Sequence, residues 1–408
     1  MEQLLTMALG IECPIYIERA ELIHNAKLQV CLNFYRGTKF DCPLCGVSNC
    51  SIHDTVYKTW RHLDFFQYPC YLSFPLPRIK CDKCGVNQYM PKWTRPGSGF
   101  TAMFEAFVVM LAKCGIPYSE MSRIVGERDK RLRRIVDYHV EKGYKEKDMS
   151  LVEKIGVDET SSKKGHNYVT VFTDQDTGKV IYVTEGKDSS TIERFANELG
   201  KHNGNAENVK EASIDMSAAF IKGFNEHLPG TEVTFDRFHV MKLLNEAVDQ
   251  VRREEQKHNP LLKNSRYSWL KNRDNLTSAQ LESLVKLEHE NLETAKAYQL
   301  KCTFQDIYSS AKNAQEAELL LESWLELALK SNLEPLQGFV NTIKSHWVGV
   351  IRYWTSRLTS GVCEGTNSII QEIKRVARGY KNMKNFINSI YLRTADIRLP
   401  RSPFTHSI

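Results

Sequence analysis

Ile155-Gly156-Val157-Asp158-Glu159 is a short apolar run that ends in two carboxylates, and it opens the part of the chain that decides the fold. Further runs of β-branched and aromatic residues follow, and segments of helical periodicity separate the later ones. Three strands followed by alternating helices and strands predict a mixed α/β domain. Strands are expected over 154–158, 166–174, 179–184, 209–215 and 232–236, with helices over 190–199 and 218–227.

Carboxylates stand at the ends of two of these runs. Asp158 follows the first run, and Asp215 follows Ala212-Ser213-Ile214. An aspartate next to a buried run is costly unless solvent, a polar partner or a cation reaches it. The ends of adjacent strands can bring two carboxylates together, as Mg²⁺ binding between protein and phosphate requires. Glu364, at the start of a helix expected after Gly361, is the best third candidate. Taken singly, each is more often a strand-end or cap residue; their order is the informative feature.

A long helical segment separates the second aspartate from the glutamate. Residues 231–337 contain no glycine and only two prolines, and Leu, Glu, Lys and Ala dominate. Such a composition predicts long helices. Two capping boxes predict helix starts, one at Ser190-Thr191-Ile192-Glu193 and one at Thr277-Ser278-Ala279-Gln280. We therefore expect an all-helical insertion over 241–345 inside an α/β domain made of 151–240 and 346–408.

Cysteines cluster at the other end of the chain. Eight of the eleven lie in the first ninety residues, and four of them form the pairs Cys42-Pro43-Leu44-Cys45-Gly46 and Cys81-Asp82-Lys83-Cys84-Gly85. Two C-x-x-C turns supply the four thiolates of a closed tetrahedral site, so we expect one structural Zn²⁺ in a module over 1–92. Two unrelated reduced pairs, or a redox pair in a βαβ setting, are the alternative. Short strands are expected over 55–60 and 70–74, among several prolines.

Residues 93–150 are predicted to form a helix-turn-helix module. Gly115-Ile116-Pro117 and Gly126 divide this segment into three helical stretches. Residues 78–134 carry a net charge of +7, which suits a polyanionic partner. A solvated basic face on a plain helical hairpin is the alternative. The candidate DNA contacts at the start of the last helix are Arg128, Lys130, Arg131, Arg133 and Arg134.

The overall composition is that of an ordinary globular protein. The 408 residues are 42% hydrophobic and 25% charged, which excludes a disordered chain, and the formal net charge is +6. No apolar run is long enough to span a bilayer, and the first residues lack the features of a signal peptide, so no membrane and a cytoplasmic location are expected.

A second basic segment, 374–401, also carries +7, so the rest of the chain sums to −8. Its first three cations are Lys374, Arg375 and Arg378.

With these motifs in this order, the chain resembles the bacterial insertion-sequence transposases of the ISL-three type over nearly its whole length. The resemblance rests on the two cysteine pairs, on Gly156-Val157-Asp158-Glu159 with the stretch through Lys163 and Val171, and on Ile214-Asp215-Met216-Ser217. It continues through Phe235-Asp236-Arg237-Phe238-His239-Val240, Gly361-x-x-Glu364-Gly365-x-Asn367 and Lys374-Arg375-x-Ala377-Arg378-Gly379-Tyr380.

The resemblance implies a catalytic triad and a fold. In the family an RNase H-like domain holds two divalent metals, Mg²⁺ or Mn²⁺, on an Asp, an Asp and a Glu, which here are Asp158, Asp215 and Glu364. Asp236 and His239 match a further motif. We expect His239 close to the scissile phosphate, with a helix-cap or core histidine as the equal alternative. The expected fold is a multidomain α+β chain with a zinc-ribbon-like module, a helix-turn-helix module and an RNase H-like catalytic domain that carries the helical insertion.

The expected function is a DNA transposase that binds the terminal inverted repeats of an insertion sequence, cleaves at its ends and joins a 3′-hydroxyl to target DNA. Double-stranded DNA is the expected partner, and the expected location is the bacterial cytoplasm at the nucleoid. Pairing two element ends implies a homodimer or larger oligomer on DNA. A sequence-specific regulator derived from a transposase would keep the DNA-binding modules without needing the triad. An RNase H-like structure-specific nuclease would cut without joining strands.

Overall fold

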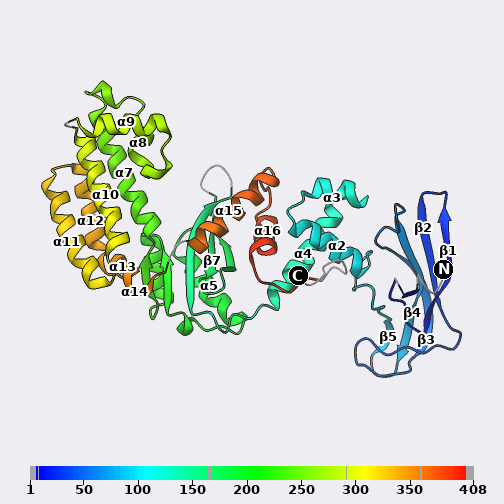
Figure 1. Ribbon diagram of the computed structural model, residues 1–408. Helices are drawn as coiled ribbons and strands as arrows, with labels where there is room; N and C mark the ends of the chain where they lie inside the picture. The colour runs from blue at the N-terminus through cyan, green and yellow to red at the C-terminus, as the bar shows by residue number, and fades with distance from the viewer. Residues whose placement is uncertain (1–5, 8, 163–166, 291, 359–360, 401–408) are drawn as a thin grey trace. The chain divides into compact units, whose positions relative to one another are not determined.

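The chain forms two compact units in the computed structural model, which describes residues 6–7, 9–162, 167–290, 292–358 and 361–400 (Figure 1). Unit 1 comprises 1–146, 391–393 and 397–408, and unit 2 comprises 147–390 and 394–396. None of the helices in the described part of the chain has the length and apolarity needed to cross a bilayer.

Unit 1 begins with a five-stranded sheet of order β1-β2-β4-β3, with β5 paired to β4. The strands at 55–60 and 70–74 are confirmed, but β4 continues through Pro75 and Pro77 to Cys81. β2 pairs only with 70–73 of β4 and β5 only with 78–81. Both prolines therefore lie where β4 has a single neighbouring strand, and a missing N–H is tolerated there. The strands are β1 Ile15–Ile23, β2 Lys27–Phe34, β3 Ser51–Arg61, β4 Cys70–Cys81 and β5 Gly85–Gln88.

Three helices follow the sheet of unit 1 between residues 102 and 145, as expected from the two breaks in the sequence. They are α2 Ala102–Lys113, α3 Tyr118–Val125 and α4 Asp129–Lys145. The Thr101 side chain caps α2 by accepting a hydrogen bond from the Phe104 N–H. Gly126 ends α3 with a φ of 66°, in the left-handed region that favours glycine, and so forms the turn into α4. Met121 of α3 and Leu132 of α4 are fully buried in the core that the helices share.

Unit 2 contains the mixed sheet that the sequence predicts. Its order is β10-β9-β6-β7-β8; β6 to β8 are antiparallel, and β9 and β10 run parallel to β6. Three antiparallel strands continued by two parallel ones form the RNase H-like sheet. His166, where one strand was expected to begin, lies outside the described residues. The elements are β6 Lys154–Ser161, β7 Tyr168–Asp174, β8 Lys179–Glu185, α5 Ser190–Lys201, η1 Ala206–Asn208, β9 Glu211–Ile214, α6 Ala218–His227 and β10 Glu232–Phe235.

One of the two predicted helix caps is wrong. Ser190 lies inside α5, and Asp188 accepts hydrogen bonds from the Ser190 N–H at 2.9 Å and from its hydroxyl. The Asp188 carboxylate therefore caps the start of α5, which is the role predicted for the Ser190 side chain. The second capping box is confirmed: the Thr277 side chain accepts from the Gln280 N–H, and the Gln280 side chain accepts from the Thr277 N–H.

The helical segment after β10 forms a bundle, and α7 leads from the sheet into it (Figure 1). Lys301, Phe304 and Trp324 are among its fully buried side chains. The segment consists of α7 Arg237–Glu255, η2 Pro260–Leu262, α8 Arg266–Leu270, η3 Arg273–Asn275, α9 Ser278–Glu288, α10 Glu293–Ser310, α11 Ala314–Lys330, α12 Glu334–Ser345, α13 Trp347–Ile351 and α14 Tyr353–Ser356. Two helices follow it, α15 Gly361–Val376 and α16 Met383–Thr394.

Candidate functional sites

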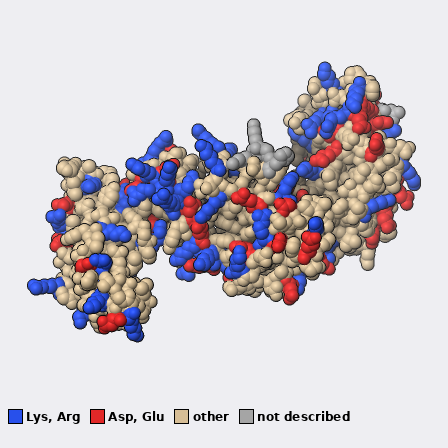
Figure 2. Space-filling view, turned by 180° about the vertical axis from the view of Figure 1, so that it is seen from behind, with Lys and Arg blue, Asp and Glu red and all other residues tan. Residues whose placement is uncertain are grey.

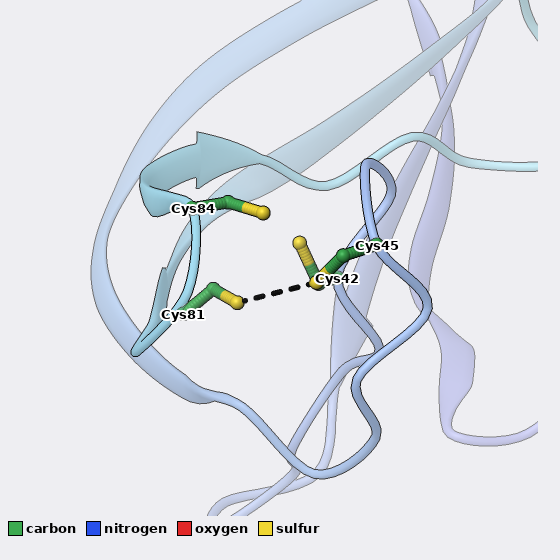
Figure 3. A group of neighbouring side chains, drawn as sticks. All are labelled: Cys42, Cys45, Cys81 and Cys84. Atoms are coloured by element: carbon green, nitrogen blue, oxygen red, sulfur yellow. Dashed lines mark hydrogen bonds between the residues drawn. The ribbon is translucent and has the colours of Figure 1, made fainter.

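The two cysteine pairs converge on one point in unit 1 (Figure 3). The sulfur atoms of Cys42, Cys45, Cys81 and Cys84 all lie within 4.8 Å of one another, and those of Cys45 and Cys81 are 3.6 Å apart. Over the described ranges this is the only group of three or more metal-ligating side chains close enough to share an ion. The donor set fits a tetrahedral metal site.

Local backbone geometry explains why the Cys81 thiol suits a cation. β4 ends at Cys81, and the turn to β5 lets the Cys84 N–H point back at the Cys81 sulfur. That hydrogen bond is the largest cause of the fall in the pKa of the Cys81 thiol to about 7. A thiol with a lowered pKa is more readily deprotonated and so binds metal more readily. The glycine that follows each pair has a positive φ, 72° at Gly46 and 74° at Gly85, which closes each turn.

In unit 2, Asp158 and Asp215 lie at the same level of neighbouring parallel strands. β6 and β9 pair with Gly156 opposite Ser213, and each aspartate follows two residues later. Burial raises the pKa of Asp158, and the negative charge of Asp215 raises it further. A carboxylate with a raised pKa beside a second carboxylate is a site that gains from a bound cation.

α15 packs lengthwise on β6 and brings Glu364 to the same region. Asn367 Nδ2 donates to Asp158 Oδ2 at 2.5 Å, Gln371 Nε2 to Thr160 Oγ1 at 3.0 Å, and Lys374 Nζ to the Ser161 carbonyl at 2.7 Å. The spacing of these donors follows one face of a helix. Glu364 is exposed and lies three residues before Asn367, nearly one turn earlier on α15.

Gly156 permits the close approach of α15. A Cβ atom at this position would lie 2.6 Å from the Cys363 sulfur and 2.8 Å from the Thr173 hydroxyl oxygen. Cys363 is itself buried and lies 3.3 Å from that hydroxyl. The glycine in the opening motif is therefore needed for the contact that positions the residue before Glu364.

His239 lies between two carboxylates. Its Nε2 is 3.9 Å from Asp158 Oδ1 and 3.9 Å from Asp236 Oδ2. Asp236 is 5% exposed and caps α7, because its Oδ1 accepts a hydrogen bond from the Phe238 N–H at 3.0 Å. A fifth of the His239 side chain is exposed, so the imidazole is reachable from solvent.

The three candidate carboxylates do not form a group as compact as the four cysteines. In the part of the chain that the structure describes, the oxygens of Asp158, Asp215 and Glu364 do not all come within 4.8 Å of each other. No role is predicted for Asn367 from the sequence, although its place three residues after Glu364 puts both residues on one helix face.

The five basic residues at the start of α4 differ in what they contact. The Arg131 guanidinium lies over the Phe100 ring at 4.3 Å and pairs with Glu127 at 2.5 Å, and that of Arg133 lies over Tyr118 at 4.3 Å. Arg128, Lys130 and Arg134 are exposed and form no ion pair with any described residue. Figure 2 shows Lys and Arg side chains gathered over the helical part of unit 1.

The cations on and after α15 also differ. Lys374 is engaged with the Ser161 carbonyl, whereas Arg375 and Arg378 are exposed and have no ion pair among the described residues. Arg401, the last cation of the basic segment, lies outside the described residues.

Family models match three consecutive parts of the chain. A model described as a transposase matches residues 155–390, more than half of the chain. The helix-turn-helix domain of transposase family ISL3 matches 90–140. The zinc finger of the transposases of IS204, IS1001, IS1096 and IS1165 matches 38–84.

Proteins named as transposases are similar to this chain over most of its length. The transposase for insertion sequence element IS1001 of Bordetella parapertussis is 28% identical over 86% of this chain and 87% of its own length. The transposase for IS1557 of Mycobacterium tuberculosis is 25% identical over 90% of this chain and 88% of its own. Among solved structures, the HTLV-2 integrase catalytic core domain with magnesium is 15% identical over 36% of this chain and 90% of its own, with a TM-score of 0.17.

Proposed function

The chain belongs to the ISL3 family of transposases, and from this premise we propose that it cleaves DNA at the ends of an insertion sequence and joins the freed 3′-hydroxyl to target DNA. The observation that carries the proposal is the approach of α15 to β6, where Asn367 contacts Asp158 beside Asp215 and one helical turn from Glu364.

The proposed catalytic residues are Asp158, Asp215 and Glu364, which would hold two Mg²⁺ or Mn²⁺ ions. Hard carboxylate oxygens suit these ions, and the raised pKa of Asp158, caused mainly by burial and also by the charge of Asp215, supports a cation at this position. When bound, such a metal pair supplies an activated water or 3′-hydroxyl and stabilises the leaving oxygen of an in-line displacement.

Asn367 fixes the orientation of the Asp158 carboxylate. His239, reachable from solvent and next to Asp158, is placed to give a proton to the leaving oxygen, while Asp236 holds the start of α7 in place.

Unit 1 would read the DNA end. We propose that Zn²⁺ at the four cysteines stabilises the sheet and that α4 binds the terminal inverted repeat. Arg128, Lys130 and Arg134 have free charges for phosphates. Arg131 and Arg133 support the same surface through their stacked guanidinium groups. In unit 2, Arg375 and Arg378, with Lys374 beside them, would follow the backbone of the cleaved strand.

This function divides the chain into four parts. We propose a zinc-binding module over 1–92, a helix-turn-helix domain over 93–150, a catalytic domain of 151–240 and 346–408, and a helical insertion over 241–345. α7 spans the 240/241 boundary as one continuous helix, which would join the insertion rigidly to the sheet. Two element ends need at least two active sites, so we propose a homodimer or larger oligomer on DNA at the bacterial nucleoid.

The test is a cleavage assay with Mg²⁺ and linear DNA that carries the sequences flanking the coding region. The wild-type chain should nick at an inverted repeat and then form joined products. Asp158→Asn should abolish both, and Asp274→Asn, an exposed aspartate of η3, should change neither. Nicking that survives in Asp158→Asn would overturn the triad.

The two competing functions predict other results in the same assay. Tight DNA binding without any nicking would favour the sequence-specific regulator. Nicked DNA that never joins a target would favour the structure-specific nuclease.

A further inference from the structure

A large groove adjoins the proposed catalytic residues in unit 2. It has a volume of about 1140 Å³ and lies among α7, α8 and α12, with Asp236 and Glu364 in its lining. A volume of this order exceeds the roughly 300–1,000 Å³ of most small-molecule sites. The groove therefore has room for a nucleotide next to the reacting phosphate.

The polar lining of the groove is rich in amides. Asn245 and Gln250 come from α7, Asn272 follows α8, and Gln305 comes from α10. Gln305 donates to Asn272 at 3.1 Å, and this bond leaves the Asn272 amide nitrogen and the Gln305 carbonyl oxygen for other partners. Carboxamides present a donor beside an acceptor, which matches the edge of a nucleobase.

The charges in the groove are suited to one or two phosphates rather than to a long polyanion. Lys242 is exposed and forms no ion pair with a described residue, whereas Arg253 and Arg266 are held by Asp249 at 3.0 and 3.5 Å. Free positive charge therefore lies at the end nearer the start of α7, where the carboxylates are. At the far end Asp249 compensates the charges of Arg253 and Arg266, and Glu246 adds an acidic side chain beside the amides.

An exposed aromatic ring stands at the catalytic end. Phe238 lines the groove and is 53% exposed, although it is a large apolar side chain. It is the second residue of α7 and follows Asp236 by two positions. Its ring meets the His239 ring edge to face, with centroids 5.4 Å apart, and His239 lies 3.9 Å from Asp158. An exposed ring beside a phosphoryl-transfer site is placed to stack on an unpaired base.

Two tryptophans on nearby helices, Trp347 and Trp354, are engaged elsewhere. Trp354 is 3% exposed in the helical core, and the Trp347 indole N–H donates to Glu318 at 3.1 Å. Neither lines the groove. Phe238 is therefore the aromatic side chain that combines exposure with proximity to the carboxylates.

We propose that this groove binds one unpaired nucleotide of the DNA strand whose phosphate lies at Asp158, with Phe238 stacked on the base and the amides facing its edge. The inference rests on the proposed function, because it assigns a DNA strand to the same site. It adds a substrate feature: the DNA end is opened by at least one base pair before it is cut.

The test compares two single-stranded ligands on the full chain. The probes are a 12-nucleotide oligodeoxyadenylate and an abasic 12-mer of equal charge, measured by fluorescence anisotropy with Ca²⁺ in place of Mg²⁺. The wild-type chain should bind the first about tenfold more tightly, as stacking on one base implies. Phe238→Leu should bring the two dissociation constants together, and Phe238→Trp should restore the ratio. Leu319→Ala, which alters a 67% exposed side chain of α11 away from the groove, should keep it.

The outcomes test the nucleotide site separately from the proposed transposase reaction. A wild-type chain without preference, or a Phe238→Leu variant that keeps it, overturns the groove assignment and leaves the cleavage reaction standing. A preference lost in Phe238→Leu, in a chain that does not nick DNA with Mg²⁺, supports the nucleotide site and overturns the transposase reaction. Unchanged binding of duplex DNA by Phe238→Leu confirms that the variant is folded.

Discussion

Asn367 of α15 donates its side-chain amide to Asp158 of β6, with 2.5 Å between Nδ2 and Oδ2. This bond joins residues 209 positions apart in the sequence. It connects the helix that carries Glu364 with the strand that carries Asp158. Among the side-chain hydrogen bonds from Asn367, Gln371 and Lys374 to β6, this is the one made by a proposed metal ligand itself.

Asn367→Ala should reduce Mg²⁺-dependent nicking by about 10–100-fold, the usual effect of removing a hydrogen bond to a metal ligand. The loss should be partly recovered at high Mg²⁺, because the carboxylate is still present but is less well oriented. Nicking rates measured across Mg²⁺ concentrations provide the readout. Gln371→Ala is the matched control, since it removes the neighbouring bond to Thr160 and leaves the carboxylate contact intact. Equal losses in both variants would mean that Asn367 acts only by holding the helix.

Asp158→Asn should raise the thermal stability of the metal-free chain while it abolishes nicking. Burial raises the pKa of Asp158 in the folded state above that of an unfolded aspartate. The folded state therefore binds the proton more tightly, and this contribution to stability is lost as the pH rises through the unfolded and then the folded pKa. At neutral pH the ionised carboxylate is destabilising, and the neutral amide removes that cost. Differential scanning calorimetry with and without Mg²⁺ is the check: Mg²⁺ should raise the Tm of the wild type only. A lower Tm for metal-free Asp158→Asn would contradict the argument.

Gly156→Ala should loosen α15 from β6. The added methyl group would meet the Cys363 sulfur at 2.6 Å and the Thr173 oxygen at 2.8 Å, and overpacking of this kind costs about 1–3 kcal/mol. Unfolding in urea should show the lost stability, and nicking should fall with it. Gly200→Ala is the control, because a Cβ there meets nothing within 4 Å. The double variant Gly156→Ala with Cys363→Ala should recover part of both losses, and no recovery would place the clash on the Gln175 side-chain amide, the atom nearest to the added methyl group.

The strand and helix order of unit 2 could be predicted because its buried strands carry near-continuous apolar runs. The hairpin of β1 and β2 was not predicted, since five consecutive residues of β1, Glu18–Leu22, are exposed and leave no apolar alternation to detect. Its turn uses His24 and Asn25, both with positive φ, rather than a glycine. The N-cap of α5 was misplaced because the Asp188 carboxylate, two residues before Ser190, accepts hydrogen bonds from the Ser190 N–H and hydroxyl.

The residues of the candidate sites could be predicted from the sequence. Their contacts with residues far away in the sequence were harder to predict. The cysteine group follows from spacing alone, since two C-x-x-C turns leave little freedom. The charge of Lys374 gives no sign that its ammonium group binds the Ser161 carbonyl, because that contact joins residues 213 positions apart. Likewise, Arg131 and Arg134 look equivalent in sequence, and only packing separates the stacked guanidinium from the free one.

Removal of the zinc ligands should unfold the sheet of unit 1 locally. Cys45→Ser should lower the zinc content, measured by plasma mass spectrometry, from one ion per chain to near zero, because three ligands bind far more weakly than four. Terminal-repeat binding should fall with it, and limited proteolysis should cut first in the segment between the cysteine pairs. Cys114→Ser alters an exposed thiol of the same unit and should change neither quantity. One zinc per chain retained in Cys45→Ser would refute the four-cysteine site.

The free cations of α4 should control the salt dependence of DNA binding. Each phosphate contact contributes about 0.9 to the slope of log K against log salt, so replacing Arg128, Lys130 and Arg134 together by alanine should lower the slope by about 3. Arg131→Ala should instead lower the Tm, because it removes the stacking on Phe100 and the ion pair with Glu127 while the slope changes little. Fluorescence anisotropy from 50 to 300 mM salt, with thermal melting of each variant, separates the two effects. A slope that falls equally in the triple variant and in Arg131→Ala would mean that the stacked guanidinium also reaches a phosphate.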